Sequence, residues 1–207
     1  MAEDLPILSP AEARVLGCLI EKKETTPDVY PMTLNALQSA ANQKTSREPV
    51  MALEQHDILR ALKLLEQKGL VRQMFASRVE RYEHMTAQRF SLTQPQIAIV
   101  GLLMLRGPQT AYELLSRSER MARISSIEDL KTNLDLLIGR HPPLIVELGR
   151  APGQREERFA HLLSGEPAMP VAAAHPVRGL SSDLEERVRV LEEQVAELKT
   201  KLRDLTG

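Results

Sequence analysis

The sequence predicts a mainly helical protein with small β hairpins, because one pattern of apolar segments occurs twice along the chain. Residues 8–20 and 92–104 both begin with leucine and a hydroxyl residue, and both carry a glycine at the same later position. Two leucine-rich segments, 58–65 and 130–137, follow at helical spacing, and each leads into a short β-prone stretch. Three helices followed by two strands is the order of a winged helix. The sequence therefore predicts two tandem winged-helix domains.

The first domain, residues 1–90, is predicted to contain three helices and a two-stranded wing. Ser9 and Glu12 have the spacing of a capping box, and Pro10 suits the first position of a helix. Gly69 stands where the third helix is expected to end. The predicted elements are helices over about residues 10–22, 33–42 and 50–67 and strands over residues 71–76 and 79–85.

The second domain, residues 91–163, is predicted to repeat this order in fewer residues. Gly107 and Pro108 are expected to end its first helix, because proline cannot continue a helix and glycine favours its end. Ser126 is expected to cap its third helix. The predicted elements are helices over about residues 95–105, 110–118 and 126–139 and strands over residues 144–148 and 158–162.

The C-terminal part of the chain changes character twice. Residues 164–180 are rich in proline and alanine and are predicted to form a linker, and residues 181–207 are predicted to form a coiled-coil helix. Valine and leucine alternate along its apolar seam, a pattern that favours a two-stranded parallel coil and hence a homodimer. The alternative is that this helix packs on the protein's own domains. The seam residues are Leu184, Val188, Leu191, Val195, Leu198, Leu202 and Leu205.

Composition limits the class of protein. Apolar residues make up 43% of the chain but aromatic residues only 3%, so the cores must be aliphatic and an aromatic platform for single-stranded nucleic acid is not expected. One cysteine excludes an internal disulfide and fits a reducing cytosol. No apolar run approaches the roughly 20 residues of a membrane span, and the acidic N-terminus is unlike a signal peptide. We therefore expect a cytoplasmic protein without a membrane partner.

Two segments carry a resemblance to a known family. Residues 13–37, which read ARVLGCLIEKKETTPDVYPMTLNAL, and residues 41–51, ANQKTSREPVM, closely resemble the YceH family of uncharacterised bacterial proteins. The resemblance covers residues 8 to about 163 and implies tandem winged-helix domains. It implies no activity, cofactor or defined site.

A winged helix binds duplex DNA with its third helix in the major groove and its wing on the backbone. In the second domain Lys131, Arg140, Arg150 and Arg155 hold places where such contacts are made. Residues 42–48 are alternatively a hydrogen-bonded brace, in which Asn42 caps the second helix and Arg47 pairs with Glu48. The candidate surface of the first domain comprises Asn42, Gln43, Lys44, Arg47, Arg60, Lys63, Gln67, Arg78 and Arg81.

Charge balance argues against a strongly basic surface. Residues 1–90 hold as many acidic as basic side chains, and so do residues 91–166. DNA-binding domains are usually basic, because neutralising phosphates dominates their affinity. Each candidate residue is alternatively an ordinary solvated charge. We predict a double-stranded DNA-binding regulator, and the alternative is a winged-helix scaffold that binds a protein partner and not DNA.

Signs of an enzyme are weak. The five histidines are scattered without the spacing of metal ligands, and no glycine-rich phosphate loop or nucleophile elbow is present. Cys18 lies on an apolar helical face and is expected to be a buried packing residue. The sequence predicts no catalytic residue, no metal and no cofactor.

Overall fold

A computed structural model of the chain describes residues 5–76, 79–150 and 156–167. Within these ranges the protein is mainly helical and has two small antiparallel sheets of two strands each. The predicted coiled-coil helix over residues 181–207, with its seven seam residues, lies outside the described residues, as do Arg78 and Arg155.

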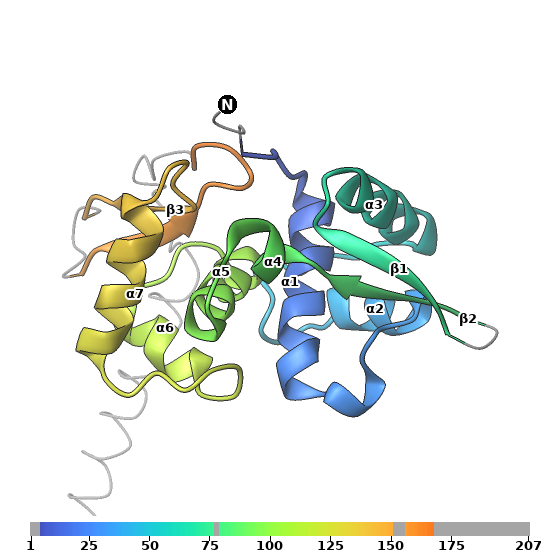
Figure 1. Cartoon of the computed structure of the whole chain (residues 1–207), viewed down its shortest axis with the longest axis horizontal. Helices are drawn as coiled ribbons and strands as arrows, with labels where there is room; N and C mark the ends of the chain where they lie inside the picture. Colours follow the sequence, from blue (N-terminus) through green and yellow to red (C-terminus); the bar gives the residue numbers. More distant parts are fainter. Residues whose placement is uncertain (1–4, 77–78, 151–155, 168–207) are drawn as a thin grey trace, which may run out of the picture. The chain divides into compact units, whose positions relative to one another are not determined.

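The order of elements divides into two similar series, shown in Figure 1. We call the series from α1 to β2 the first copy and the series from α5 to β4 the second copy, and the short helix α4 joins them. The elements are α1 (Pro10–Thr25), a 3-10 turn η1 (Pro27–Val29), α2 (Leu34–Ala41), α3 (Gln55–Gln67), β1 (Val71–Ala76), β2 (Val79–His84), α4 (Thr86–Phe90), α5 (Gln94–Arg106), α6 (Ala111–Ser118), α7 (Ile127–Gly139), β3 (Ile145–Leu148) and β4 (Arg158–His161).

The predicted starts of the helices are confirmed where a cap defined them. Ser9 accepts a hydrogen bond from the Glu12 backbone N–H, and the Glu12 carboxylate accepts one from the Ser9 N–H at 2.9 Å. This reciprocal pair satisfies two backbone donors that a helix N-terminus otherwise leaves free. At the starts of α2 and α7, the hydroxyls of Thr33 and Ser126 each accept one hydrogen bond from the backbone N–H three residues later, without the reciprocal bond.

The predicted start of the third helix is wrong. The sequence placed it near Val50, but α3 begins at Gln55, and the preceding residues are not helical. The side chain of Asn42 accepts a hydrogen bond from the Leu53 N–H at 2.8 Å and donates one to the Leu53 carbonyl at 2.9 Å. Glu54 then occupies the N-cap position, so the backbone before it is held by a side chain and not by a helical turn. The short helix α4 was also not predicted.

The two copies share a backbone connection between the hairpin and the chain before the second helix. Met32 and Tyr82 exchange N–H···O bonds of 3.0 and 2.8 Å in the first copy. Gln109 and Phe159 exchange bonds of 3.1 and 2.8 Å in the second. Each hairpin therefore gains a third extended segment, which fixes its position against its own helices.

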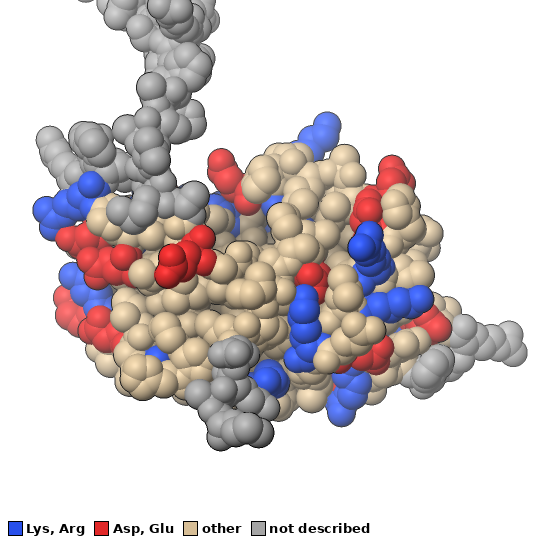
Figure 2. Space-filling view, turned by 90° about the horizontal axis from the view of Figure 1, so that it is seen from above, with Lys and Arg blue, Asp and Glu red and all other residues tan. Residues whose placement is uncertain are grey.

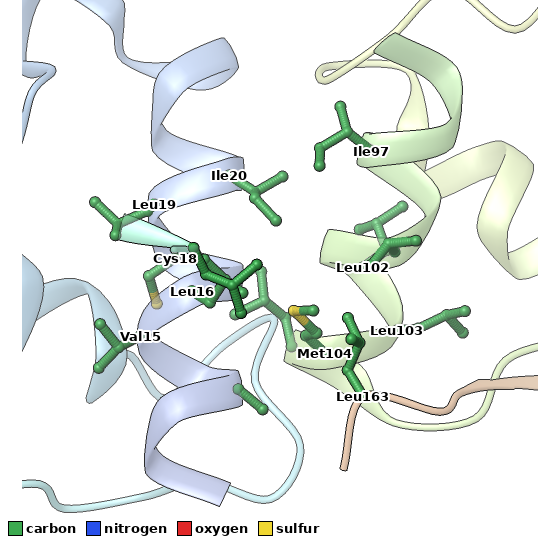
Figure 3. Packing of buried hydrophobic residues seen from close by; sticks show 14 of the residues in the cluster. Val15, Leu16, Cys18, Leu19, Ile20, Ile97, Leu102, Leu103, Met104 and Leu163 are labelled. Carbon is green, nitrogen blue, oxygen red and sulfur yellow. The ribbon is translucent and has the colours of Figure 1, made fainter. Parts of the chain in front are cut away.

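The core runs through the contact between α1 and α5, which lie side by side (Figures 1 and 3). A Cβ atom on Gly101 would lie 2.7 Å from Cγ2 of Ile20, and one on Gly17 would lie 2.9 Å from Cγ of Leu105 and 3.2 Å from Cβ of Met104. Each helix thus presents its glycine to side chains that follow the other helix's glycine by three or four positions. Since Gly17 and Gly101 are equivalent in the two copies, the contact is reciprocal, as in a two-fold symmetric interface.

The described helices include none that is both long enough and apolar enough to cross a membrane.

Candidate nucleic-acid interface

The exposed face of α3 brings together three of the predicted site residues. Arg60, Lys63 and Gln67 are all exposed, whereas Ile58 and Leu62 on the same helix are buried. Spacings of three and four residues place the three polar side chains on one side of the helix. Within the described part of the chain, neither Arg60 nor Lys63 has an ion-pair or hydrogen-bond partner, so both cations are available to an external ligand.

The same helix carries acidic groups. Glu54 and Glu66 are exposed, and Asp57 is partly exposed and lies 3.2 Å from His56. Figure 2 shows basic and acidic side chains interspersed on the face it presents, with apolar and neutral surface between them. The basic residues of α3 are therefore a local feature of a surface of mixed charge.

Arg47 belongs to a buried brace and not to the surface. Its exposed fraction is 5%, and its guanidinium donates to both Glu21 carboxylate oxygens, at 2.6 and 3.1 Å, and to the Ala40 carbonyl at 3.0 Å. Burial favours the neutral acid, but the hydrogen bonds and charge of Arg47 outweigh it and hold the pKa of Glu21 below its usual value. The expected partner Glu48 is exposed instead, and its backbone N–H donates to the Leu105 carbonyl.

Of the other candidate residues before α3, two make hydrogen bonds within the fold and one is exposed. Asn42 fixes Leu53, as described above, and the Gln43 side chain accepts a hydrogen bond from Arg47 at 2.9 Å. Lys44 is exposed, and the described residues give its side chain no partner. Of the four candidates in this segment, Lys44 is the one that is both exposed and without a side-chain partner among the described residues.

The first hairpin carries one arginine that is partly buried and one that is exposed. Arg81 is partly buried and donates to the Pro31 carbonyl at 2.7 Å, so it holds the strand to the preceding loop. Arg72 is exposed and pairs with Glu83, its cross-strand neighbour, with Nε 2.7 Å from the carboxylate. Arg72 thus lies where a wing would meet a ligand, but its charge is partly neutralised.

Of the candidates predicted in the second copy, Lys131 on α7 is the one whose side chain is exposed and without a partner among the described residues. Arg140 donates to the Phe90 carbonyl at 2.7 Å, and the Nε of Arg150 lies 2.9 Å from Glu157. Leu136, on the same helix as Lys131, is 58% exposed.

Sequence reasoning missed Arg14, which positions the segment leading into α3. This side chain is 2% exposed and donates to the Ala41 carbonyl at 3.0 Å and the Pro49 carbonyl at 2.5 Å. Its guanidinium thereby ties α1 to the last residue of α2 and to the middle of the loop between α2 and α3. The available signal was an arginine within an otherwise apolar helical stretch, since a buried charge requires several hydrogen bonds.

The described residues contain no group of three or more histidine, cysteine, aspartate or glutamate side chains able to hold a metal ion. Cys18 is fully buried, as predicted, and burial raises the pKa of its thiol to about 11, so the nucleophilic thiolate does not form near neutral pH. Burial also lowers the pKa of His84 and His161 to about 4, so both imidazoles are neutral.

The fold and this surface define a mainly helical protein, built from two copies of one helix-and-hairpin series, with free polar side chains on the third helix of the first copy. The chain belongs to the family described as protein of unknown function DUF480, whose model matches residues 8–154. The predicted membership of an uncharacterised bacterial family is thereby confirmed.

Relatives in this family match over nearly their whole length. The chain is 68% identical to a UPF0502 protein of Mesorhizobium japonicum over all of both chains. It is 54% identical to a UPF0502 protein of Xanthomonas campestris pv. campestris (strain B100), over 98% of this chain and 95% of the relative. A UPF0502 protein of Stenotrophomonas maltophilia (strain K279a) is 48% identical over 99% of this chain and 96% of the relative.

Proposed function

We propose that this protein is a non-enzymatic, cytoplasmic DNA-binding regulator built from two winged-helix domains. The order of three helices and a hairpin in each copy supports the winged-helix assignment, as does the third extended segment that joins each hairpin. The observation that carries the DNA-binding proposal is the exposed set of Arg60, Lys63 and Gln67 on α3, whose two cations have no partner among the described residues.

In this proposal α3 enters the major groove. Arg60 and Gln67 contact base edges, where guanine accepts from arginine and adenine pairs with a side-chain amide. Lys63 binds a phosphate or a guanine, and Lys44 binds the backbone beside the start of the helix. The β1–β2 hairpin lies along the adjacent phosphates, as a wing does.

Acidic and basic side chains are nearly equal in number in this chain, so we expect the DNA affinity of one copy to be low. A few cations on one helix neutralise only a few phosphates, so one copy alone binds weakly. When two weak sites are joined, binding at the first raises the effective concentration of DNA at the second site. The overall affinity is therefore higher than that of either site alone. A homodimer formed through residues 181–207 supplies this second site, with the seven seam residues from Leu184 to Leu205 in its core.

Fluorescence anisotropy of the purified full chain with mixed duplex fragments, at about 50 and 200 mM salt, tests the proposal. Binding that weakens steeply between the two salt concentrations is expected. The double variant Arg60→Glu/Lys63→Glu should lose this binding, because it reverses two charges facing the phosphates. Arg120→Glu/Arg123→Glu is the matched control, since it also reverses two exposed basic side chains, which lie between α6 and α7 and are not among the candidate DNA contacts.

Two results would overturn the proposal. The first is absence of binding at the lower salt concentration. The second is equal loss of binding in Arg120→Glu/Arg123→Glu and in the α3 variant, since that result means a diffuse effect of net charge and not a site on α3.

A protein-interaction scaffold is the second candidate, favoured by exposed apolar side chains in the second copy. Tyr112 on α6 is 60% exposed and Leu136 on α7 is 58% exposed. Large exposed apolar side chains are characteristic of protein contacts. Under this alternative, Tyr112→Ser and Leu136→Lys abolish capture of a partner in a cross-linked pull-down, while Arg60→Glu/Lys63→Glu leaves it intact.

A further inference from the structure

A polar cavity of about 370 Å³ lies where the end of α1 meets the loop after α2 and the turn after α6. Small-molecule sites have volumes of roughly 300–1,000 Å³. The lining contains elements of both copies, because Arg120 follows α6 whereas the other residues belong to the first copy. The residues that line the cavity are Glu21, Lys22, Thr25, Thr26, Gln43, Lys44, Thr45, Ser46 and Arg120.

The lining has an excess of positive charge. Glu21 is its one carboxylate, and both oxygens of this group accept hydrogen bonds from the buried Arg47. Three cations remain around the cavity, of which Lys22 lies 3.5 Å from Glu21. Lys44 and Arg120 are exposed, and the described residues give their side chains no partner. The cavity is therefore electrostatically suited to a ligand with more than one negative charge.

The loop of residues 43–46 adds unused hydrogen-bond donors. Within the described part of the chain, no hydrogen bond uses the backbone N–H groups of Lys44, Thr45 and Ser46 or the hydroxyls of Thr45 and Ser46. Ser46 has a left-handed backbone with φ of 62°. Backbone N–H groups in a loop that includes a left-handed residue commonly bind anions, and neighbouring cations strengthen such hydrogen bonds.

The wall of the cavity formed by the end of α1 offers hydrogen-bond acceptors to a ligand. The hydroxyls of Thr25 and Thr26 donate to the carbonyls of Glu21 and Lys22, at 2.9 and 3.2 Å, so their oxygens are left to accept from a ligand. A ligand that carries phosphate groups together with hydroxyls matches both walls.

We infer that this cavity binds a small phosphorylated solute, whose phosphate groups are held by Lys22, Lys44, Arg120 and the N–H groups of residues 44–46. Because Arg120 comes from the second copy, the bound solute bridges the two copies. This inference goes beyond DNA binding by α3 and does not depend on it.

Isothermal titration of the full chain with inorganic pyrophosphate, at constant ionic strength, tests the inference. We expect a Kd of about 1 mM or tighter and an affinity lower by about 10-fold or more in Lys44→Glu and in Arg120→Glu. Lys63→Glu is the matched control, because it reverses an exposed lysine outside the cavity and should leave pyrophosphate binding unchanged. Circular dichroism establishes that each variant is folded, and Lys44→Gln provides a second variant that removes the charge without reversing it.

Failure of the wild-type protein to bind pyrophosphate overturns the inference, as does equal weakening in Lys63→Glu. DNA anisotropy on Arg120→Glu separates this site from the proposed DNA surface, because Lys44 belongs to both whereas Arg120 belongs to the cavity only. Arg120→Glu should keep its DNA affinity while it loses pyrophosphate. If both cavity variants lose DNA and pyrophosphate together, the cavity binds the DNA backbone and the small-solute inference is wrong. Pyrophosphate binding that survives in Arg60→Glu/Lys63→Glu supports it even if no DNA binds.

Discussion

The reciprocal contact between α1 and α5 predicts that Gly101→Ala destabilises the protein. The added Cβ would lie 2.7 Å from Cγ2 of Ile20 and 3.3 Å from its Cβ. Ile20 is 1% exposed, and its Cγ2 is attached directly to a β-branched carbon, so it cannot rotate away cheaply. Overpacking of this kind costs about 1–3 kcal/mol, and the better helix propensity of alanine returns about 1 kcal/mol. The difference is a net loss of up to about 2 kcal/mol.

Urea unfolding followed by far-UV circular dichroism measures this loss as a lower midpoint at unchanged slope. Gly139→Ala is the matched control, because Gly139 also lies in a helix and a Cβ there would meet no atom within 4 Å. That variant should be as stable as the wild type or more stable, by up to about 1 kcal/mol.

A double-mutant cycle with Ile20→Ala identifies the contact. Ile20→Ala alone leaves a cavity and destabilises the protein, but it also removes the methyl group that the new Cβ of Gly101→Ala would meet. The double variant should therefore lose less stability than the two single losses added together. Strict additivity, or a Gly101→Ala protein as stable as Gly139→Ala, would refute the close approach of the two helices.

Three further predictions concern buried polar groups. Glu21→Gln leaves the buried guanidinium of Arg47 without its anionic partner and should lower stability by about 3 kcal/mol in urea unfolding; Lys22→Gln, at the next position, should cost much less. Asn42→Ala removes both hydrogen bonds to Leu53 and should lower stability by about 1–3 kcal/mol, measured by thermal unfolding. Asn42→Asp should lose less stability, because its carboxylate still accepts a hydrogen bond from the Leu53 N–H. Burial lowers the pKa of His84 from 6.5 to about 4. Between these pH values the imidazole is protonated in the unfolded chain but neutral in the folded protein. The stability of the folded protein with a neutral His84 is therefore complete above about pH 6.5. It falls by about 3 kcal/mol as the pH is lowered towards 4. His84→Gln should reduce the pH dependence of the unfolding free energy over that range, while the buried His161, whose pKa is lowered to the same value, keeps part of the slope. An unchanged slope would mean that His84 is protonated in the fold.

The sequence predicted most helix and strand positions because their signals are local. Ser9 with Glu12 and Ser126 with Asp129 lie within one helical turn, so the caps that begin α1 and α7 are readable from neighbouring residues. Both hairpins likewise lie within a residue or two of the predicted strands.

The errors arise where residues distant in sequence decide the structure. Val50 and Leu53 are three residues apart, a helical spacing, but the backbone of Leu53 is bound by Asn42, eleven residues earlier. Arg47 was a surface candidate because its neighbours are polar, yet its partner Glu21 lies 26 residues upstream. Periodicity and composition carry no information about such pairings. The exposed positions of Arg60 and Lys63 were predictable, since they follow from the apolar face of α3 alone.

The reciprocal glycine contact also has a consequence for synthesis of the protein. A ribosome releases the N-terminal part of a chain first. Residues 10–25 can therefore become helical before residues 94–106 exist, and Gly17 and Ile20 then present an apolar strip with nothing against it. A chain halted or cleaved between the copies keeps this strip uncovered, and because the strip fits a near-copy of itself, we expect such fragments to pair with one another or aggregate.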